Sequence, residues 1–140
     1  MSLTVLTSER LPISVEGDVA VVRRRAREVA QAARFDAFAS AAVTTAASEL
    51  SRNALVHGGG GYALVEHVCE GSREGLRLTF VDEGPGIAEV DRALRGGYST
   101  GRSLGLGLSG SRRLVDDFRI DTIAGKGTVV EVVKWARFRR

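Results

Sequence analysis

Two polar side chains one helical turn apart are the first residues in this sequence whose types and spacing could do chemistry. Glu49 and Asn53 lie four positions apart in a segment with helical periodicity, which places them on one face of a helix. An amide oxygen is a suitable hard ligand for Mg²⁺, and a neighbouring carboxylate can act as general base toward a hydroxyl group or water. The pair is compatible with a metal-assisted reaction, and equally with an ordinary solvated helix face.

A second candidate group combines one carboxylate with two glycines. Asp82 ends an apolar run and opens the motif Asp82-x-Gly84-x-Gly86. A carboxylate at the end of a strand can accept a hydrogen bond from an exocyclic amine, and glycines beside it allow a flat ring to lie against the backbone. The motif is compatible with a binding site for a heterocyclic base. The alternative is a plain turn that Asp82 initiates.

A third group is a glycine-rich stretch before a predicted helix. Gly105-x-Gly107-x-x-Gly110 matches the dinucleotide fingerprint literally. It follows a glycine-rich loop instead of an apolar strand, so the structural context of that fingerprint is missing. Free backbone N–H groups at the start of a helix can still bind an anion. Residues 105–108 are therefore a candidate phosphate-binding segment, with a flexible connector as the alternative.

The elements that must position these groups follow from the hydrophobic pattern and the turn residues. Gly17-Asp18 and Ser40 are predicted to cap the two long helices. Strands and helices do not alternate as they do around a parallel sheet, so the predicted fold class is α+β: a two-layer sandwich with a mostly antiparallel mixed sheet covered on one face by helices. The predicted elements are a strand at 10–15, helices ending at 33 and 56, strands at 62–70 and 76–82, a short helix at 89–94, a loop at 96–107, a helix at 108–117 and strands at 118–123 and 128–135.

The composition is that of one ordinary globular domain. With 140 residues, 44% of them hydrophobic, we expect a single domain over residues 1–140, with residues 1–8 flexible or partly vector-derived. The single Cys69 excludes an internal disulfide and suits a cytoplasmic location. The net charge of +3 is spread along the chain, and no segment is long and apolar enough to span a bilayer. We therefore expect neither a nucleic-acid nor a membrane partner.

The order of these motifs resembles that of a known superfamily. Glu49-x-x-x-Asn53, Asp82-x-Gly84-x-Gly86, the run from Gly105 to Leu108 and a final Gly-Thr resemble the N box, G1 box, G2 box and terminal threonine of the GHKL ATPases, which have the Bergerat ATP-binding fold. Within that superfamily the chain is most similar to the small serine-protein kinases that regulate bacterial sigma factors, in particular the RsbT-type switch kinases of the stressosome. The stretches that carry this likeness are 44–53, 82–87, 97–100, 113–118 and 124–135.

The resemblance implies ATP and Mg²⁺ as cofactors and a role for each motif. Asn53 would ligate Mg²⁺, Glu49 would be the general base, and Asp82 with Thr128 would recognise the adenine amino group. Gly84 and Gly86 would pass close to the base. The phosphates would lie under a lid at 96–103 that includes Thr100 and Arg102, and would be held by Gly105, Leu106, Gly107 and Leu108. Arg102 could reach the γ-phosphate or remain a surface arginine.

The resemblance also implies an activity and partners. The chain would be a serine/threonine-protein kinase that phosphorylates a small STAS-domain antagonist or stressosome protein, and the released kinase would activate a phosphatase. Two alternatives stay open: an anti-sigma factor that sequesters a sigma factor, and an ATP-binding switch without catalysis. His57 followed by Gly58 is more similar to the anti-sigma relatives, although a histidine at a helix end also interacts with the helix dipole. The cluster from Arg23 to Arg27 reads as a solvated helix face or a docking face.

Overall fold

The computed structural model describes residues 2–86, 104–123 and 125–136, with the backbone alone for 104–107. The predicted short helix at 89–94 and the predicted lid at 96–103 lie outside the described residues. In chain order the described elements are β1 (Thr4–Ile13), α1 (Glu16–Ala32), α2 (Ala37–Val56), β2 (Gly61–Glu70), β3 (Arg73–Asp82), α4 (Leu104–Leu114), β4 (Asp117–Ile123) and β5 (Gly127–Trp135).

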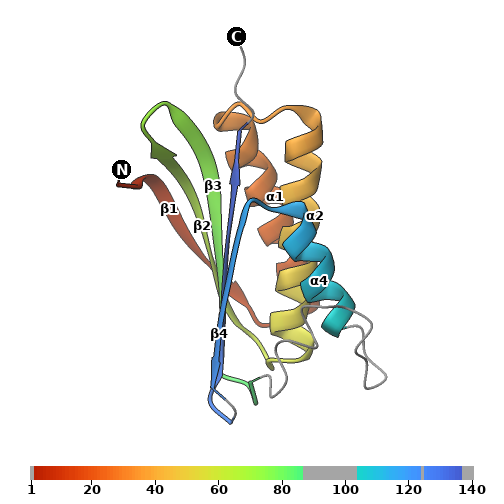
Figure 1. Ribbon diagram of the computed structural model, residues 1–140. Coiled ribbons are helices and arrows are strands. Elements are labelled where there is room, and N and C mark those ends of the chain that lie inside the picture. Colours follow the sequence, from red (N-terminus) through yellow and green to blue (C-terminus); the bar gives the residue numbers. More distant parts are fainter. Residues whose placement is uncertain (1, 87–103, 124, 137–140) are drawn as a thin grey trace.

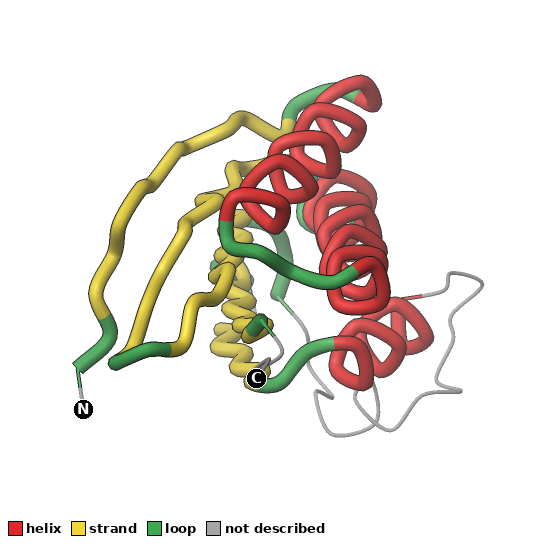
Figure 2. The backbone as a smooth tube through the Cα atoms, turned by 90° about the horizontal axis from the view of Figure 1, so that it is seen from above, coloured by secondary structure: helices red, strands yellow, loops and turns green. Residues whose placement is uncertain are grey.

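The strands form one sheet, and the helices cover one of its faces. The sheet has the order β1-β2-β3-β5-β4, and every pair of neighbouring described strands is antiparallel. Figures 1 and 2 show α1, α2 and α4 side by side on the concave face of the curved sheet. The predicted α+β sandwich is confirmed. The described sheet is antiparallel throughout instead of mixed, and β3 pairs with β5, which places the ends of these two strands side by side.

The first strand begins earlier than the sequence indicates. The predicted strand start at residue 10 is corrected, because β1 pairs with β2 from Thr4, opposite Cys69, to Ile13, opposite Gly61. Residues 4–8, which were expected to be flexible or partly vector-derived, belong to this strand. A register shift interrupts the ladder between Val5 and Thr7. Residues 4–8 form an exposed edge strand with no apolar alternation, so backbone pairing with β2 holds them and the side-chain pattern carries no signal of it.

The caps of both long helices lie before their predicted positions. The cap of α1 is Val15, and the carboxylate of Asp18 accepts hydrogen bonds from the backbone N–H groups of Ser14 at 2.8 Å and Val15 at 3.0 Å, which lowers the pKa of Asp18. The cap of α2 is Asp36, which accepts from the N–H of Ala39 at 2.7 Å, instead of Ser40. In α1 the cap position holds an apolar residue, and Asp18 accepts from the preceding N–H groups at the third helical position. In α2, Asp36 and Ser40 are both good capping residues, and propensity alone does not choose between them.

The hairpin between β2 and β3 is tighter than predicted. The expected loop covered residues 71–75, whereas the turn is Gly71-Ser72, with Gly71 at φ 62° and Glu70 opposite Arg73. Gly75 belongs to β3, where its Cα faces the ring of Trp135 on β5: a Cβ would lie 2.6 Å from the ring atom Cε3. This glycine therefore serves strand packing and does not mark a loop.

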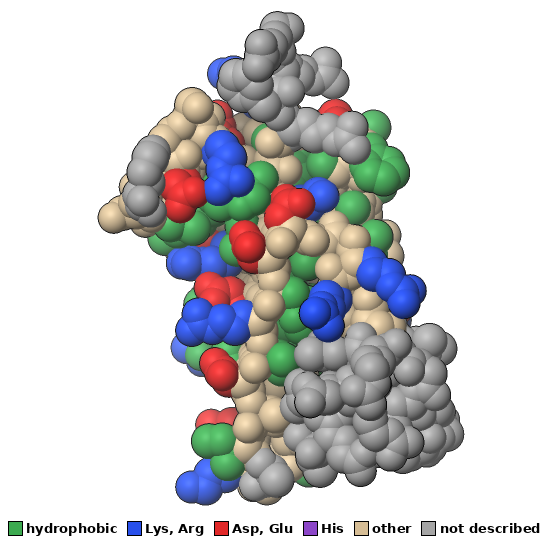
Figure 3. All heavy atoms as spheres, viewed as in Figure 1, with side chains coloured by type: hydrophobic (Ala, Val, Ile, Leu, Met, Phe, Trp, Pro, Cys, Tyr) green, Lys and Arg blue, Asp and Glu red, His purple; other side chains and the backbone are tan. Residues whose placement is uncertain are grey.

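The hydrophobic core lies between the helix layer and the inner face of the sheet. Both long helices turn an apolar stripe toward the sheet, and small residues on the helices let them pack closely. Central members of the core are Val22, Ala26, Val43, Ala47, Leu50, Leu76, Leu78 and Phe80. In the described part of the chain, no helix is both long and apolar enough to cross a membrane. Basic and acidic side chains are interspersed on the face seen in Figure 3.

Candidate active site

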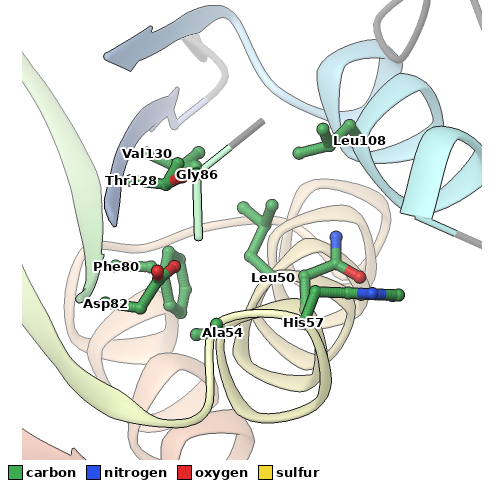
Figure 4. Close-up of a pocket in the computed structure, with 11 residues that line it drawn as sticks. Leu50, Ala54, His57, Phe80, Asp82, Gly86, Leu108, Thr128 and Val130 are labelled. Carbon is green, nitrogen blue, oxygen red and sulfur yellow. The ribbon is translucent and has the colours of Figure 1, made fainter. Parts of the chain in front are cut away.

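A cavity opens at one end of the helix layer, where the last turn of α2 meets the end of β3, the start of β5 and the first half of α4. The space it encloses, open mouth included, is about 450 Å³, of which about 40 Å³ can hold the centre of a water-sized sphere. Figure 4 shows Asp82 and Thr128 on the strand side, and His57 and Leu108 on the helix side. Residues that line the cavity are Leu50, Asn53, Ala54, His57, Gly58, Phe80, Asp82, Gly86, Leu108, Thr128 and Val130.

The walls of this cavity are apolar. Leu50, Ala54, Phe80, Leu108 and Val130 line it and are each less than one tenth exposed. An apolar slot with polar groups at one side suits a flat heterocycle that carries a polar edge. Sequence reasoning missed four of these five residues, because their apolar periodicity is that of ordinary core positions and carries no separate signal for a ligand.

Asp82 is held by backbone groups on both sides. It is the last residue of β3, opposite Gly61 of β2 and Thr128 of β5. Its carboxylate accepts hydrogen bonds from the N–H of Gly84 at 3.0 Å and from the N–H of Thr128. Burial raises the pKa of Asp82 above its ordinary value, and the two N–H groups offset this only in part. The carboxylate is therefore fixed at the cavity in an environment that disfavours its charge.

This raised pKa predicts a pH dependence of stability in the absence of nucleotide. Between the ordinary value of 3.8 and the higher value in the fold, the folded chain binds more protons than the unfolded chain, so the free energy of unfolding falls as pH rises. Asp82→Asn lacks this titration. We expect the melting temperature of the variant to rise relative to wild type, in thermal scans, as the pH increases above 3.8. A difference that stays constant or moves the opposite way would contradict the assignment.

The end of α2 packs directly on the segment that follows β3. A Cβ at Gly58 would lie 2.6 Å from the Cβ of Asp82, and a Cβ at Gly84 would lie 2.6 Å from the Cα of Gly58. Contacts this short leave no room for a methyl group at either position. From the sequence, Gly58 was singled out with His57, as a likeness to the anti-sigma relatives. Its role as the surface against which the Asp82 carboxylate is placed has no signal in the local sequence.

Gly58→Ala is expected to lower the free energy of unfolding by about 1–3 kcal/mol, because the added methyl group must displace the Asp82 side chain. The matched control is Gly110→Ala in α4, where an added Cβ meets nothing within 4 Å. That change is expected to stabilise the chain by about 0.5–1 kcal/mol, since glycine is unfavourable inside a helix. Urea unfolding of the two variants measures both effects. Equal changes in the two would show that the Gly58 contact is unimportant.

Gly86 is positioned by the β4–β5 hairpin. Its φ is 75°, and a Cβ there would lie 2.6 Å from the carbonyl oxygen of Ile123. The N–H of Gly125 donates to the carbonyl oxygen of Pro85 at 2.6 Å. The glycines after Asp82 were expected to make room for a ring. In the structure they allow close approach of the chain's own backbone, at Gly58 for Gly84 and at β4 for Gly86.

Asn53 and Glu49 differ in their relation to the cavity. Asn53 lines it, and its Nδ2 atom is buried without a hydrogen-bond partner among the described residues. Glu49, one turn earlier on α2, is not among the lining residues; its side chain is 42% exposed, and its carboxylate lies 3.9 Å from the guanidinium of Arg52. The structure therefore brings Asn53 together with Asp82 and Thr128, and leaves Glu49 at the surface of the same helix.

The polar side chains at the cavity fit Mg²⁺ only if a phosphorylated ligand supplies part of its coordination shell. No cluster of three His, Cys, Asp or Glu side chains capable of holding a metal occurs in the described ranges. The Nδ2 atom of Asn53 has no hydrogen-bond partner within the part of the chain that the structure describes. Rotation of the amide group by 180° exchanges its nitrogen and oxygen, and the oxygen can then act as a metal ligand. Mg²⁺ commonly takes one or two protein ligands and completes its shell with substrate phosphates and water. Asn53 thus fits an ion that arrives with a phosphorylated ligand.

The first turn of α4 contains the predicted phosphate-binding glycines. The helix runs from Leu104 to Leu114, so its predicted start at 108 is corrected: residues 104–107 have helical backbone. Leu108 is buried and lines the cavity. The N-terminal end of this helix, with its unpaired N–H groups, therefore lies near the cavity. Thr100 and Arg102 fall outside the described residues.

A family model and related proteins of known function both match this chain over most of its length. The model of the family described as "Histidine kinase-like ATPase domain" matches residues 11–134. The serine/threonine-protein kinase RsbT of Bacillus subtilis is 38% identical over 125 residues, which cover 89% of this chain and 94% of that protein. The anti-sigma F factor of Thermoanaerobacter sp. is 26% identical over 99 residues, 66% of this chain and 68% of that protein.

A solved structure agrees in fold. A chain from the crystal structure of the SiaB–SiaC complex from Pseudomonas aeruginosa superposes with a TM-score of 0.56 and 12% identity, over 94% of this chain and 91% of that chain. At this identity the likeness supports the fold alone. The family match over most of the chain, the 38% identical relative and the shared architecture together confirm the resemblance seen in the motifs. This chain belongs to the family of histidine kinase-like ATPase domains.

Proposed function

We propose that this chain is a serine/threonine-protein kinase that uses ATP and Mg²⁺. The observation that carries the proposal is the convergence of Asn53, Asp82 and Thr128 on one apolar cavity. These residues come from three separate motifs, in a chain that is 38% identical over 89% of its length to the kinase RsbT. The proposal takes the activity from that relative and the binding site from the geometry of this chain.

In this proposal each group at the cavity has one task. The adenine lies between the apolar walls, with its amino group toward Asp82 and Thr128. Asn53 holds Mg²⁺, which neutralises charge on the phosphates when it is bound. The N–H groups at the start of α4 bind the phosphates. Glu49 accepts the proton of the attacking hydroxyl group of the substrate, a role compatible with its exposed position, because the hydroxyl arrives on a second protein.

The proposed substrate is a small STAS-domain protein, either an antagonist of an anti-sigma factor or a stressosome component. Phosphorylation would change which partners bind one another, and the released kinase would then activate a phosphatase. This partner switching would control a stress response that depends on a sigma factor. Phosphoryl transfer needs mainly positioning and charge neutralisation, which a chain of this size can supply.

The test is phosphoryl transfer with defined components. The chain is incubated with γ-labelled ATP, Mg²⁺ and STAS-domain proteins encoded beside it, and the labelled residue is mapped. We expect label on one serine or threonine, lost when that residue is replaced by alanine or when the divalent cation is removed with a chelator. Absence of ATP binding at millimolar nucleotide would defeat the proposal.

A second candidate function rests on the 26% identity to anti-sigma F factors. In that case the chain would hold a sigma factor and use nucleotide binding to exchange it for an antagonist. Co-purification from cells separates the two functions. Recovery of a STAS-domain protein supports the switch kinase, whereas recovery of a sigma factor supports the anti-sigma alternative. A chain that binds ATP but transfers no phosphate to any partner would be a silent switch.

A further inference from the structure

Two threonines face each other across the strands that flank the cavity. Thr122 of β4 and Thr128 of β5 are register partners, and their Oγ1 atoms are 3.0 Å apart. The Thr122 hydroxyl also donates a hydrogen bond to the carbonyl oxygen of Gly127 at 3.1 Å. Thr128 is 7% exposed and lines the cavity, whereas Thr122 is outside the lining residues. The sequence analysis assigned no role to Thr122.

The single proton of each hydroxyl decides the direction of these bonds. Either hydroxyl could donate in the contact between the two threonines. The Gly127 carbonyl oxygen can only accept, and with the Thr122 proton assigned to it the donor between the two hydroxyl groups is Thr128. The Thr128 oxygen has then used its only donor, and what it can still offer a ligand is a lone pair. Thr128 therefore acts as a hydrogen-bond acceptor toward the cavity.

The second polar group on the strand side of the cavity is also an acceptor. Asp82 lies opposite Thr128 in the β3–β5 ladder, and Figure 4 shows the two side chains on the same side of the cavity. An ionised carboxylate has no proton to donate. A ligand edge that meets both groups must therefore supply two donors. The 6-amino group of adenine does so, whereas the 6-oxo group of guanine would place an oxygen against two acceptors.

We propose that Thr122 is a positioning residue that orients the Thr128 hydroxyl as an acceptor, and that this orientation makes the cavity select a 6-amino purine over a 6-oxo purine. The inference rests on the proposed function, since it assumes that ATP is the ligand of this cavity. The inference goes beyond the proposed function because Thr122 lies outside the cavity and affects base specificity through Thr128.

Replacement of Thr122 tests the inference. In Thr122→Val the Thr128 proton loses its acceptor, so the Thr128 hydroxyl is free to turn and donate toward a carbonyl oxygen of the ligand. We expect the ratio of the GTP to the ATP dissociation constant, measured by calorimetry, to fall about tenfold, through a weaker bond to ATP and a new one to GTP. Thr122→Ser keeps the hydroxyl and should keep the ratio of wild type.

Two controls separate this role from a purely structural one. Thr79→Val makes the same chemical change on β3, at a position that faces Leu64 and Glu131 in the neighbouring strands and does not line the cavity; it should leave the ratio unchanged. Purine riboside triphosphate has neither an amino nor an oxo group at position 6. Its affinity should be the same for wild type and Thr122→Val, because the effect passes through that position.

The outcomes distinguish the two proposals. If wild type binds ATP and Thr122→Val keeps the ratio of wild type, or weakens purine riboside triphosphate as much as ATP, the role of Thr122 is overturned while the kinase proposal stands. If Thr122→Ser changes the ratio as much as Thr122→Val, the hydroxyl is not responsible, which also overturns it. If wild type binds no ATP, both proposals fail together.

Discussion

Replacing Asp82 with asparagine is expected to weaken ATP binding by about 10- to 100-fold, the effect of losing a hydrogen bond to a charged group. The carboxylate is fixed by the N–H groups of Gly84 and Thr128, and it lines an otherwise apolar cavity. An asparagine in the same position must satisfy those N–H groups with its only oxygen, and it then presents an NH₂ group to the ligand. Two donors would face each other where the adenine amino group is expected. Calorimetry or fluorescent-nucleotide titration measures the loss.

Unfolding would not explain a loss of binding in this variant. Because burial raises the pKa of Asp82, asparagine removes an unfavourable charge from the apo protein. The melting temperature of Asp82→Asn at neutral pH is therefore expected to equal or exceed that of wild type. Asp121→Asn is the matched control, since the side chain of Asp121 is 78% exposed on β4 and does not line the cavity. Unchanged ATP affinity in Asp82→Asn would overturn the adenine assignment.

Replacing Glu49 with glutamine is expected to lower the rate of phosphoryl transfer by about 10²- to 10⁴-fold, the usual contribution of a general base. ATP affinity should change little, because Glu49 is not among the residues that line the cavity. Glutamine keeps the size of the side chain and removes its ability to accept a proton. Single-turnover transfer to the STAS-domain substrate, together with ATP titration, separates the chemical step from binding.

Stability should be almost unaffected by the Glu49 change. The carboxylate lies 3.9 Å from Arg52 with both side chains well exposed, and such pairs contribute about 0–1 kcal/mol. Glu28→Gln is the matched control, since Glu28 forms a comparable exposed pair with Arg25 at 3.2 Å on α1. Transfer at the wild-type rate in Glu49→Gln would place the base elsewhere. A parallel loss of ATP binding would show that Glu49 acts in binding instead.

The parts of the fold that the sequence predicted well are those with strong local periodicity. The apolar stripes of α1 and α2 and the apolar runs of β2, β3 and β5 repeat over many residues, and their types were correct. Boundaries were predicted less well. Val15 and Asp36 are the caps of the long helices in place of Gly17-Asp18 and Ser40. Propensity disfavours Val15 as a cap, and it does not separate Asp36 from Ser40. The first half of β1 has no periodic signal, since it is an exposed edge.

The sequence by itself determined which residues could do chemistry and the order in which they occur. Residue types and short spacings are local properties of the sequence. Residues one helical turn apart lie on the same face of the helix, whatever the rest of the fold. Only the tertiary structure decided which of them meet. Pairing of β3 with β5 brings Asp82 to Thr128, close packing at Gly58 places the end of α2 on Asp82, and the rotation of α2 turns Asn53 toward the cavity. These contacts join distant segments and therefore depend on packing of the whole sheet. The contact of Thr122 with Thr128 differs, because the two residues meet across a single hairpin.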